Sequence, residues 1–185
     1  MTSWEPIQTE RLTIRDYVQS DYDDLYRLQS NPDVTRFLLY DPKTADEVTA
    51  SLALRMSPTA LDAGGQALTR AVTLRETGQH VGEVTFFMVD TKHRLGEIGF
   101  IFHPDFHGRG YAYEASVELL RFGFETLGLH RIIGRLDARN SASAGLLTRL
   151  GLRQEAHFVR NEFIKGEWSD ELVFAILDEE WRERD

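Results

Sequence analysis

The chain has no cysteine among its 185 residues. This excludes disulfide bonds, thiol catalysis and thiolate zinc sites, and it fits a reducing compartment. No apolar run approaches the roughly 20 residues that a membrane-spanning helix needs. Stretches rich in Pro, Gly or Ser that would separate two domains are also missing. We therefore expect a single domain over residues 1–185, a cytoplasmic location and no membrane partner.

Basic residues are fewer than acidic residues in this chain. The chain has 21 Lys and Arg against 30 Asp and Glu, which gives a formal net charge of −9. Such a balance argues against broad nucleic-acid binding, so no nucleic-acid partner is predicted. It favours a cationic partner, such as an amine or a basic peptide. Solubility alone also explains the charge.

Periodicity and turn residues divide the chain into alternating strands and helices. Strands are predicted over residues 11–15, 67–75, 80–90, 97–102, 131–136, 154–163 and 168–176. Helices are predicted over 21–29, 31–38, 44–55, 114–127, 140–150 and 178–183. This order predicts an α/β (α+β) fold with a mixed, mostly antiparallel sheet flanked by helices. At least one parallel strand pair is expected, because helices separate the strands on either side of residue 110.

A glycine-containing loop between a predicted strand and a predicted helix is the most informative segment. It comprises His107, Gly108, Arg109, Gly110, Tyr111 and Ala112. Glycines allow a positive φ and a close approach of the backbone, and N–H groups at a helix start attract anions. The loop therefore predicts a site for a phosphorylated cofactor. The alternative is an ordinary glycine turn.

Four ordered segments carry a family pattern. They are Thr9-Glu10-Arg11-Leu12-x-Ile14-Arg15; Glu97-Ile98-Gly99-Phe100 with the loop and Glu114-Ala115; Asn140-x-x-Ser143 with Leu150-Gly151-Leu152; and Gly166-x-Trp168-x-Asp170. The chain resembles the GNAT acyl-CoA N-acyltransferases, and within them the RimJ/RimL-type branch. The resemblance implies a GNAT-like fold and direct transfer of an acetyl group from acetyl-CoA to a primary amine. Two places depart from the pattern: His107 replaces the usual Gln or Arg, and Leu152 replaces an aromatic residue.

The resemblance also assigns the cofactor residues. It implies that the amides of residues 107–112 bind the CoA pyrophosphate. Main-chain groups of Phe100, Ile101 and Phe102, on a strand that splays from its neighbour, would pair with pantetheine. Asn140 would contact the same arm, although its N-cap position explains it equally well. Ser143 would lie near the thioester sulfur and donate a proton to the leaving thiolate. A thiol of pKa about 8.5 also leaves tolerably as an anion.

Two carboxylates are candidates for the general base, Glu83 and Glu97. Each lies in a predicted strand among apolar neighbours, where burial would raise the pKa of a carboxyl group. Either residue is also explained, without any catalytic role, as an edge or surface Glu. An α-amine of pKa about 8 needs little help from a base, whereas a lysine ε-amine at about 10.4 needs more.

The remaining expectations concern metals and partners. His103 and His107 have a metal-like spacing, but Pro104 disfavours a helix between them and no carboxylate completes a motif, so no metal is predicted. The acceptor site is expected among residues 21–56 and the last hairpin. The acceptor is a protein N-terminus or a small-molecule amine, with aminoglycosides and polyamines as alternatives. A catalytically silent CoA-binding sensor or scaffold is the rival function, and a homodimer is left open.

Overall fold

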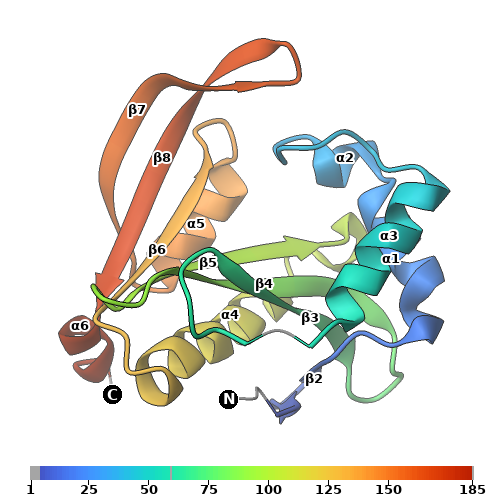
Figure 1. Ribbon diagram of the computed structural model, residues 1–185, viewed down its shortest axis with the longest axis horizontal. Coiled ribbons are helices and arrows are strands. Elements are labelled where there is room, and N and C mark those ends of the chain that lie inside the picture. The colour runs from blue at the N-terminus through green and yellow to red at the C-terminus, as the bar shows by residue number, and fades with distance from the viewer. Residues whose placement is uncertain (1–4, 59, 185) are drawn as a thin grey trace.

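One eight-stranded sheet runs through residues 5–58 and 60–184, the part of the chain that this computed structural model describes (Figure 1). Its strands are β1 (Ile7–Gln8), β2 (Leu12–Arg15), β3 (Gln66–Leu74), β4 (His80–Asp90), β5 (Leu95–Phe102), β6 (Arg131–Asp137), β7 (Arg153–Ile164) and β8 (Glu167–Leu177). They lie in the order β1-β2-β3-β4-β5-β6-β8-β7, and only β5 and β6 pair in parallel. The predicted mixed, mostly antiparallel sheet is confirmed. The two-residue strand β1 was not predicted.

The helices are α1 (Tyr22–Gln29), α2 (Pro32–Thr35), α3 (Ala45–Met56), α4 (Tyr111–Arg121), α5 (Ser141–Arg149) and α6 (Asp178–Arg182). Short 3-10 turns precede α1 (η1, Gln19–Asp21) and follow β5 (η2, Pro104–Phe106), and a π-helical turn continues α4 (η3, Phe122–Thr126). A capping box starts α3, because the Thr44 side chain accepts from the Glu47 N–H and the Glu47 carboxylate accepts from the Thr44 N–H. In the described part of the chain, no helix is long and apolar enough to cross a membrane.

Helices cover both faces of the sheet and bury two hydrophobic clusters. On one face α4 packs against the central strands, where the Phe122 ring meets the Phe86 ring edge-on with centroids 5.7 Å apart. On the other face α1 and α3 cover β3 (Figure 1). The smaller cluster there consists of Tyr17, Leu25, Val48, Leu52 and Ala71. Adjacent residues of β3 divide between the clusters, since Ala71 belongs to one and Val72 to the other.

Strands β5 and β6 separate after a short parallel contact. They pair only from Leu95↔Arg131 to Glu97↔Ile133, although β5 continues to Phe102. In an antiparallel ladder, alternate residues bond to a given neighbour. The His103 N–H donates to the Val81 carbonyl at 3.0 Å, so Ile101 also bonds toward β4. The main-chain groups of Phe100 and Phe102 therefore face the gap that opens beside β6.

The hairpin β7–β8 extends beyond the rest of the sheet (Figure 1). Its tip is fixed to α2, because Lys165 Nζ donates to the Thr35 carbonyl at 2.6 Å. Trp168 and Phe163 pack against each other near the tip, with ring centroids 5.3 Å apart. Asp170 accepts hydrogen bonds from the His157 ring and from the main-chain N–H of Arg160. These contacts give Trp168 and Asp170 a stabilising role in the hairpin.

Candidate active site

The loop before α4 has the backbone geometry of an anion site. Gly108 and Gly110 have φ values of +73° and +81°, and Gly110 is the N-cap of α4. The helix therefore starts at Tyr111, three residues earlier than predicted. The N–H groups of Tyr111, Ala112 and Tyr113 are in its first turn, where no intrahelical carbonyl can accept them. No hydrogen-bond partner for these three amides is found among the described residues.

The loop is held by Arg11, the residue directly before β2. Arg11 Nη1 donates to the Arg109 carbonyl at 2.8 Å, and the same guanidinium pairs with Glu114 at 2.7 Å. Glu114 also accepts from the Thr9 hydroxyl at 2.5 Å, so it holds the first turn of α4 to the segment before β2. Sequence reasoning did not assign Arg11 to the site, although its segment and that of Glu114 both belong to the family pattern.

His107 contributes its ring as well as its main chain. Its Nε2 lies 2.9 Å from the Phe102 carbonyl and donates to it. This carbonyl is thus already paired, while the Phe100 carbonyl still faces the gap. The resemblance assigns only the amide of His107 to the cofactor, and the ring has a separate role in holding the end of β5. The expectation that Ile101 offers main-chain groups to the cofactor is wrong, because the register directs those groups to β4.

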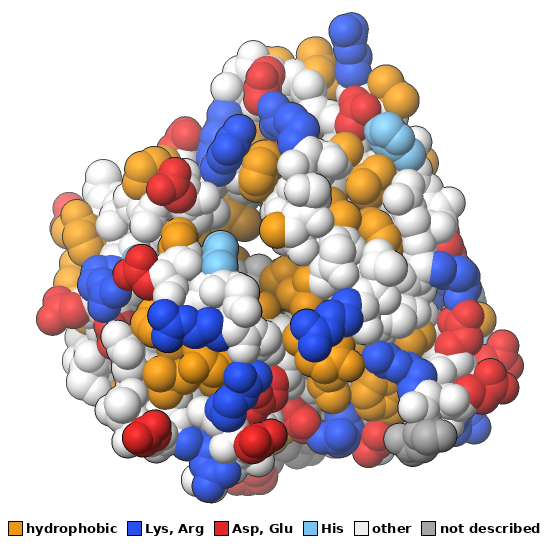
Figure 2. Space-filling view, turned by 180° about the vertical axis from the view of Figure 1, so that it is seen from behind, with side chains coloured by type: hydrophobic (Ala, Val, Ile, Leu, Met, Phe, Trp, Pro, Cys, Tyr) orange, Lys and Arg blue, Asp and Glu red, His pale blue; other side chains and the backbone are white. Residues whose placement is uncertain are grey.

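A cavity of about 520 Å³ lies where β5 separates from β6, and it is bordered by β5, α4 and α5. The predicted cofactor residues on its lining are Phe100, Ile101, Phe102, His107, Gly108, Gly110, Tyr111, Ala112, Asn140 and Ser143. Arg109 is not on the lining, and its guanidinium lies 5.8 Å from the centre of the Phe106 ring. Seen from behind, the molecule is hollowed near its centre, and hydrophobic, basic and His side chains border the hollow (Figure 2). A cavity with a cradle of free amides and an unpaired strand edge fits a long ligand with a pyrophosphate group.

Asn140 and Ser143 lie at the far wall of this cavity. Asn140 is the N-cap of α5, and its Oδ1 accepts from the Ser143 N–H at 3.1 Å. The cap explanation of Asn140 is thus confirmed. Both residues also line a second cavity of about 330 Å³, as do Phe100 and Ile101. The two cavities therefore meet at the N-terminus of α5.

Carboxylates dominate the charge of the second cavity. Glu97, Asp137, Glu162 and Glu171 line it, together with Arg135 as its one Arg or Lys among the described residues. Arg135 Nε donates to Glu97 at 3.1 Å, and its Nη1 lies 3.6 Å from Glu171. Asn161 Nδ2 donates to the second Glu171 oxygen at 2.6 Å. One guanidinium thus bridges two carboxylates from strands β5 and β8.

Glu97 has the environment expected of a general base. Burial raises the pKa of its carboxyl group above the ordinary value, and the neighbouring Glu171 and Glu162 raise it further. The ion pair with Arg135 opposes this rise without cancelling it. The side chain is only 16% exposed, yet it lies on the cavity wall. Glu97 therefore combines a raised pKa with a position on the wall of the second cavity.

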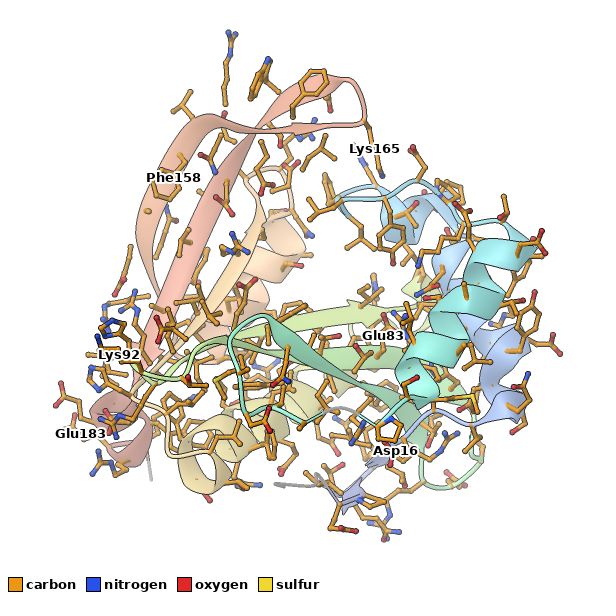
Figure 3. The ribbon with its side chains drawn as sticks, in the orientation of Figure 1. Asp16, Glu83, Lys92, Phe158, Lys165 and Glu183 are labelled. Carbon is orange, nitrogen blue, oxygen red and sulfur yellow. The ribbon has the colours of Figure 1, made fainter. Side chains whose placement is uncertain are left out.

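Glu83, the other predicted base, does not have the raised pKa expected of it. It is buried beneath α3 (Figure 3), and it lines neither cavity. Arg55 donates to both carboxylate oxygens, at 2.7 and 2.8 Å, and the Tyr17 hydroxyl donates at 2.8 Å. Although burial alone would raise the pKa of Glu83, the Arg55 charge and these hydrogen bonds lower it. The predicted raised pKa is wrong, because the sequence does not show which cation the fold brings to the carboxylate.

The two histidines of the metal-like spacing face different partners. His103 Nδ1 accepts from the Asp105 N–H at 3.3 Å and caps η2, whereas His107 bonds to the Phe102 carbonyl. Among the described residues, no group of three or more His, Cys, Asp or Glu side chains is arranged to hold a metal ion.

Fold and site together define an enzyme that brings a phosphorylated donor against a polar acceptor cleft. The family model for an acetyltransferase (GNAT) domain matches residues 11–153. The chain belongs to this family and is an acetyl-CoA-dependent N-acetyltransferase.

Whole-length similarity supports that assignment. The Uncharacterized N-acetyltransferase YnaD of Bacillus subtilis (strain 168) is 31% identical over 175 residues, 95% of this chain and 98% of YnaD. The structure of an acetyltransferase (GNAT family) from Bacillus anthracis has a TM-score of 0.84 at 29% identity, covering 94% of this chain and 99% of that one.

Relatives with a named acceptor match only part of the chain. The spermidine N(1)-acetyltransferase of Vibrio cholerae is 28% identical over 104 residues, 56% of this chain and 60% of its own. The [Ribosomal protein uS5]-alanine N-acetyltransferase of Escherichia coli (strain K12) is 29% identical over 84 residues, 45% of this chain and 43% of its own.

Proposed function

We propose that the chain acetylates a small cationic amine, which binds in the second cavity while acetyl-CoA occupies the first. The observation that carries this proposal is the junction of the two cavities at Phe100, Asn140 and Ser143. An acceptor nitrogen and a thioester placed on either side of this junction would meet without an enzyme-bound intermediate. The absence of cysteine agrees with direct transfer.

The charge of the second cavity favours a cationic acceptor. Its four carboxylates face the guanidinium of Arg135 on the lining, and Arg139 pairs with Asp137 from outside it. Carboxylates remain in excess, so an ammonium group entering the cavity meets a favourable potential. The contact of Lys165 with Thr35 connects the tip of the hairpin to α2 (Figure 3) and narrows access for a peptide chain. A cavity of about 330 Å³ suits a small molecule better than a protein terminus.

The two relatives that match only part of the chain indicate different acceptors. The likeness to the spermidine enzyme supports a small amine. The likeness to the ribosomal-protein enzyme supports a protein N-terminus and a place in the RimJ/RimL-type branch. We place the chain in that branch by its sequence motifs, and we prefer the small amine because of the charge and size of the second cavity.

The residues of the junction suggest how transfer proceeds. The loop amides before and within α4 bind the pyrophosphate, and the main-chain groups of Phe100 with the Phe102 N–H hold pantetheine. The Phe100 N–H, or that of Phe102, polarises the thioester carbonyl. As the amine nitrogen forms the C–N bond, Glu97 accepts its surplus proton. The C–S bond then breaks, and the Ser143 hydroxyl donates a proton to the CoA thiolate. Ser143 regains a proton from solvent, and Glu97 releases the amine proton to solvent.

Release of CoA thiol with a panel of amines tests this function. The panel holds small mono- and diamines, aminoglycosides and peptides with free N-termini. We expect turnover with the small cationic amines, and a Glu97→Gln variant with kcat/KM lower by about 10²- to 10⁴-fold. Glu155→Gln is the matched control, because Glu155 pairs with Arg131 outside both cavities.

Three results contradict the proposal. Turnover only with peptides would assign a protein N-terminus as acceptor. Tight acetyl-CoA binding in calorimetry without turnover on any amine would favour a silent sensor. A normal rate for Glu97→Gln between pH 6 and 9 would remove Glu97 as the base.

A further inference from the structure

Arg149 is the one Arg or Lys on the described lining of the cofactor cavity. It lies in the last turn of α5, exposed to solvent, and no Asp or Glu among the described residues forms an ion pair with it. The basic residue of the second cavity differs in this respect, because Arg135 is bound to two carboxylates. In a chain with a net charge of −9, an unpaired guanidinium on a cavity wall is available to a ligand anion.

The ring of Tyr113 fixes the position of this guanidinium. Arg149 Cζ lies 4.3 Å from the centre of the Tyr113 ring. Tyr113 is half-buried in the first turn of α4 and packs against the main hydrophobic cluster, so the ring is a firm support. A guanidinium stacked on an aromatic face keeps the N–H groups at its edge free to bind an anion in a forked geometry.

The position along α5 separates Arg149 from the reacting end of the site. Arg149 lies six positions after Ser143, which is about 9 Å along a helix axis. The loop amides already supply neutral donors for a pyrophosphate. CoA carries a second anionic group, the phosphate monoester on the ribose 3′-oxygen, and the carbonyl end of a helix such as α5 would repel it. A phosphate there requires a cation, and Arg149 supplies one.

The other basic residues near this end of the cavity are engaged or turned away. Arg109 lies toward the Phe106 ring and is not part of the lining. Arg184 donates to the Leu150 carbonyl and lies over the Trp181 ring.

We propose that Arg149, supported by Tyr113, binds the 3′-phosphate of CoA and lets the enzyme distinguish CoA from 3′-dephospho-CoA. The inference rests on the proposed placement of the pyrophosphate at the loop before α4. It concerns donor recognition alone and is independent of the acceptor.

Calorimetric titration with CoA and with 3′-dephospho-CoA tests this site without turnover. The wild-type chain should bind CoA about 10-fold more tightly, as expected for one charge-assisted, partly exposed phosphate contact. Arg149→Gln should remove this difference by weakening CoA binding alone. Arg149→Lys should keep part of it, because it keeps the charge without the fork. Arg121→Gln is the matched control, since Arg121 lies on α4 outside the cavity and pairs with Glu118.

Each other outcome overturns the inference. Equal wild-type affinities for the two ligands would show that the 3′-phosphate has no partner. Equal weakening of both ligands by Arg149→Gln would place Arg149 at the pyrophosphate or in the fold. If the wild type bound neither ligand, the proposed donor site would fail, and this inference with it.

Discussion

The ion pair between Arg55 and Glu83 offers the sharpest test of how α3 is held on the sheet. Replacing Arg55 with Met keeps an apolar stem of similar length and removes the guanidinium. Glu83 would then remain as a carboxylate in a buried position, since its side chain is 2% exposed and that of Arg55 only 16%. Solvent screens such a pair weakly, so the loss should approach that of other broken buried pairs.

The size of the effect follows from the contacts that remain. Breaking a buried pair from one side costs about 3–5 kcal/mol. The Tyr17 hydroxyl still donates to Glu83 at 2.8 Å, so we expect the lower figure, about 3 kcal/mol. For a chain of this length, that lowers Tm by about 6–12 °C. The double variant Arg55→Met/Glu83→Gln should recover much of this stability, because no charge is left buried.

The pH dependence carries the diagnostic sign. In the wild type the pKa of Glu83 lies below its unfolded value of 4.5, so its contribution to stability is present above that value and lost as pH falls through the folded pKa. Without Arg55, burial dominates and raises the pKa. The variant is then destabilised most at neutral pH and approaches the wild type in acid.

Urea unfolding at about pH 7.5 and about pH 4 measures both quantities. The free-energy difference between wild type and Arg55→Met should be largest at the higher pH, and small for the double variant at either pH. A loss below about 1 kcal/mol at neutral pH, or a gap that widens in acid, would refute a buried, charge-paired Glu83.

Two further predictions concern the active site. Gly110→Val should weaken acetyl-CoA binding at least 10-fold, because φ at this position is +81° and a branched side chain strains that conformation. Gly78→Val, at φ +72° in a hairpin turn, is the control for backbone strain, and equal affinities of the two variants for acetyl-CoA in calorimetry would contradict the anion cradle. Arg135→Gln should move the acidic limb of the pH profile of kcat/KM to higher pH, because Arg135 lowers the pKa of Glu97. The control Arg131→Gln should leave that limb in place, and an unmoved limb for Arg135→Gln would show that Glu97 is not the catalytic base.

The fold was largely readable because its strands and helices carry clear periods. The parallel pair between β5 and β6 also followed from the helix between them. Three details of the fold were not predicted. A strand as short as Ile7–Gln8 has no period to detect. The start of α4 depends on the left-handed conformation of Gly110, and the predicted helix over residues 31–38 is a single turn, Pro32–Thr35.

The site was readable where the backbone carries it and not where side chains from distant segments meet. The spacing of the glycines predicts the loop, since few other residue types adopt the positive φ values found there. The stack of Arg149 on Tyr113 joins two helices, and nothing local in either sequence indicates it. The ring of His107 was overlooked for a related reason, because its partner is the carbonyl of Phe102, five residues earlier on the end of a strand.

The contrast between Glu83 and Glu97 shows what local sequence leaves undetermined. The register pairs Glu83 with Ile101 and Phe87 with Glu97, so both carboxylates lie on the same face of the sheet. Burial acts on both in the same direction, and their neighbours move the two pKa values apart. Arg55 and the Tyr17 hydroxyl lower the pKa of Glu83. Glu171 and Glu162 help to keep the pKa of Glu97 raised against the opposing effect of Arg135. Arg55 reaches Glu83 from a helix that seals that end of the sheet, with solvent excluded. Arg135 reaches Glu97 from the splayed strand, half-exposed. The same residue type on the same sheet face therefore holds a helix in one place and lies on a cavity wall with a raised pKa in the other, where we propose that it accepts a proton.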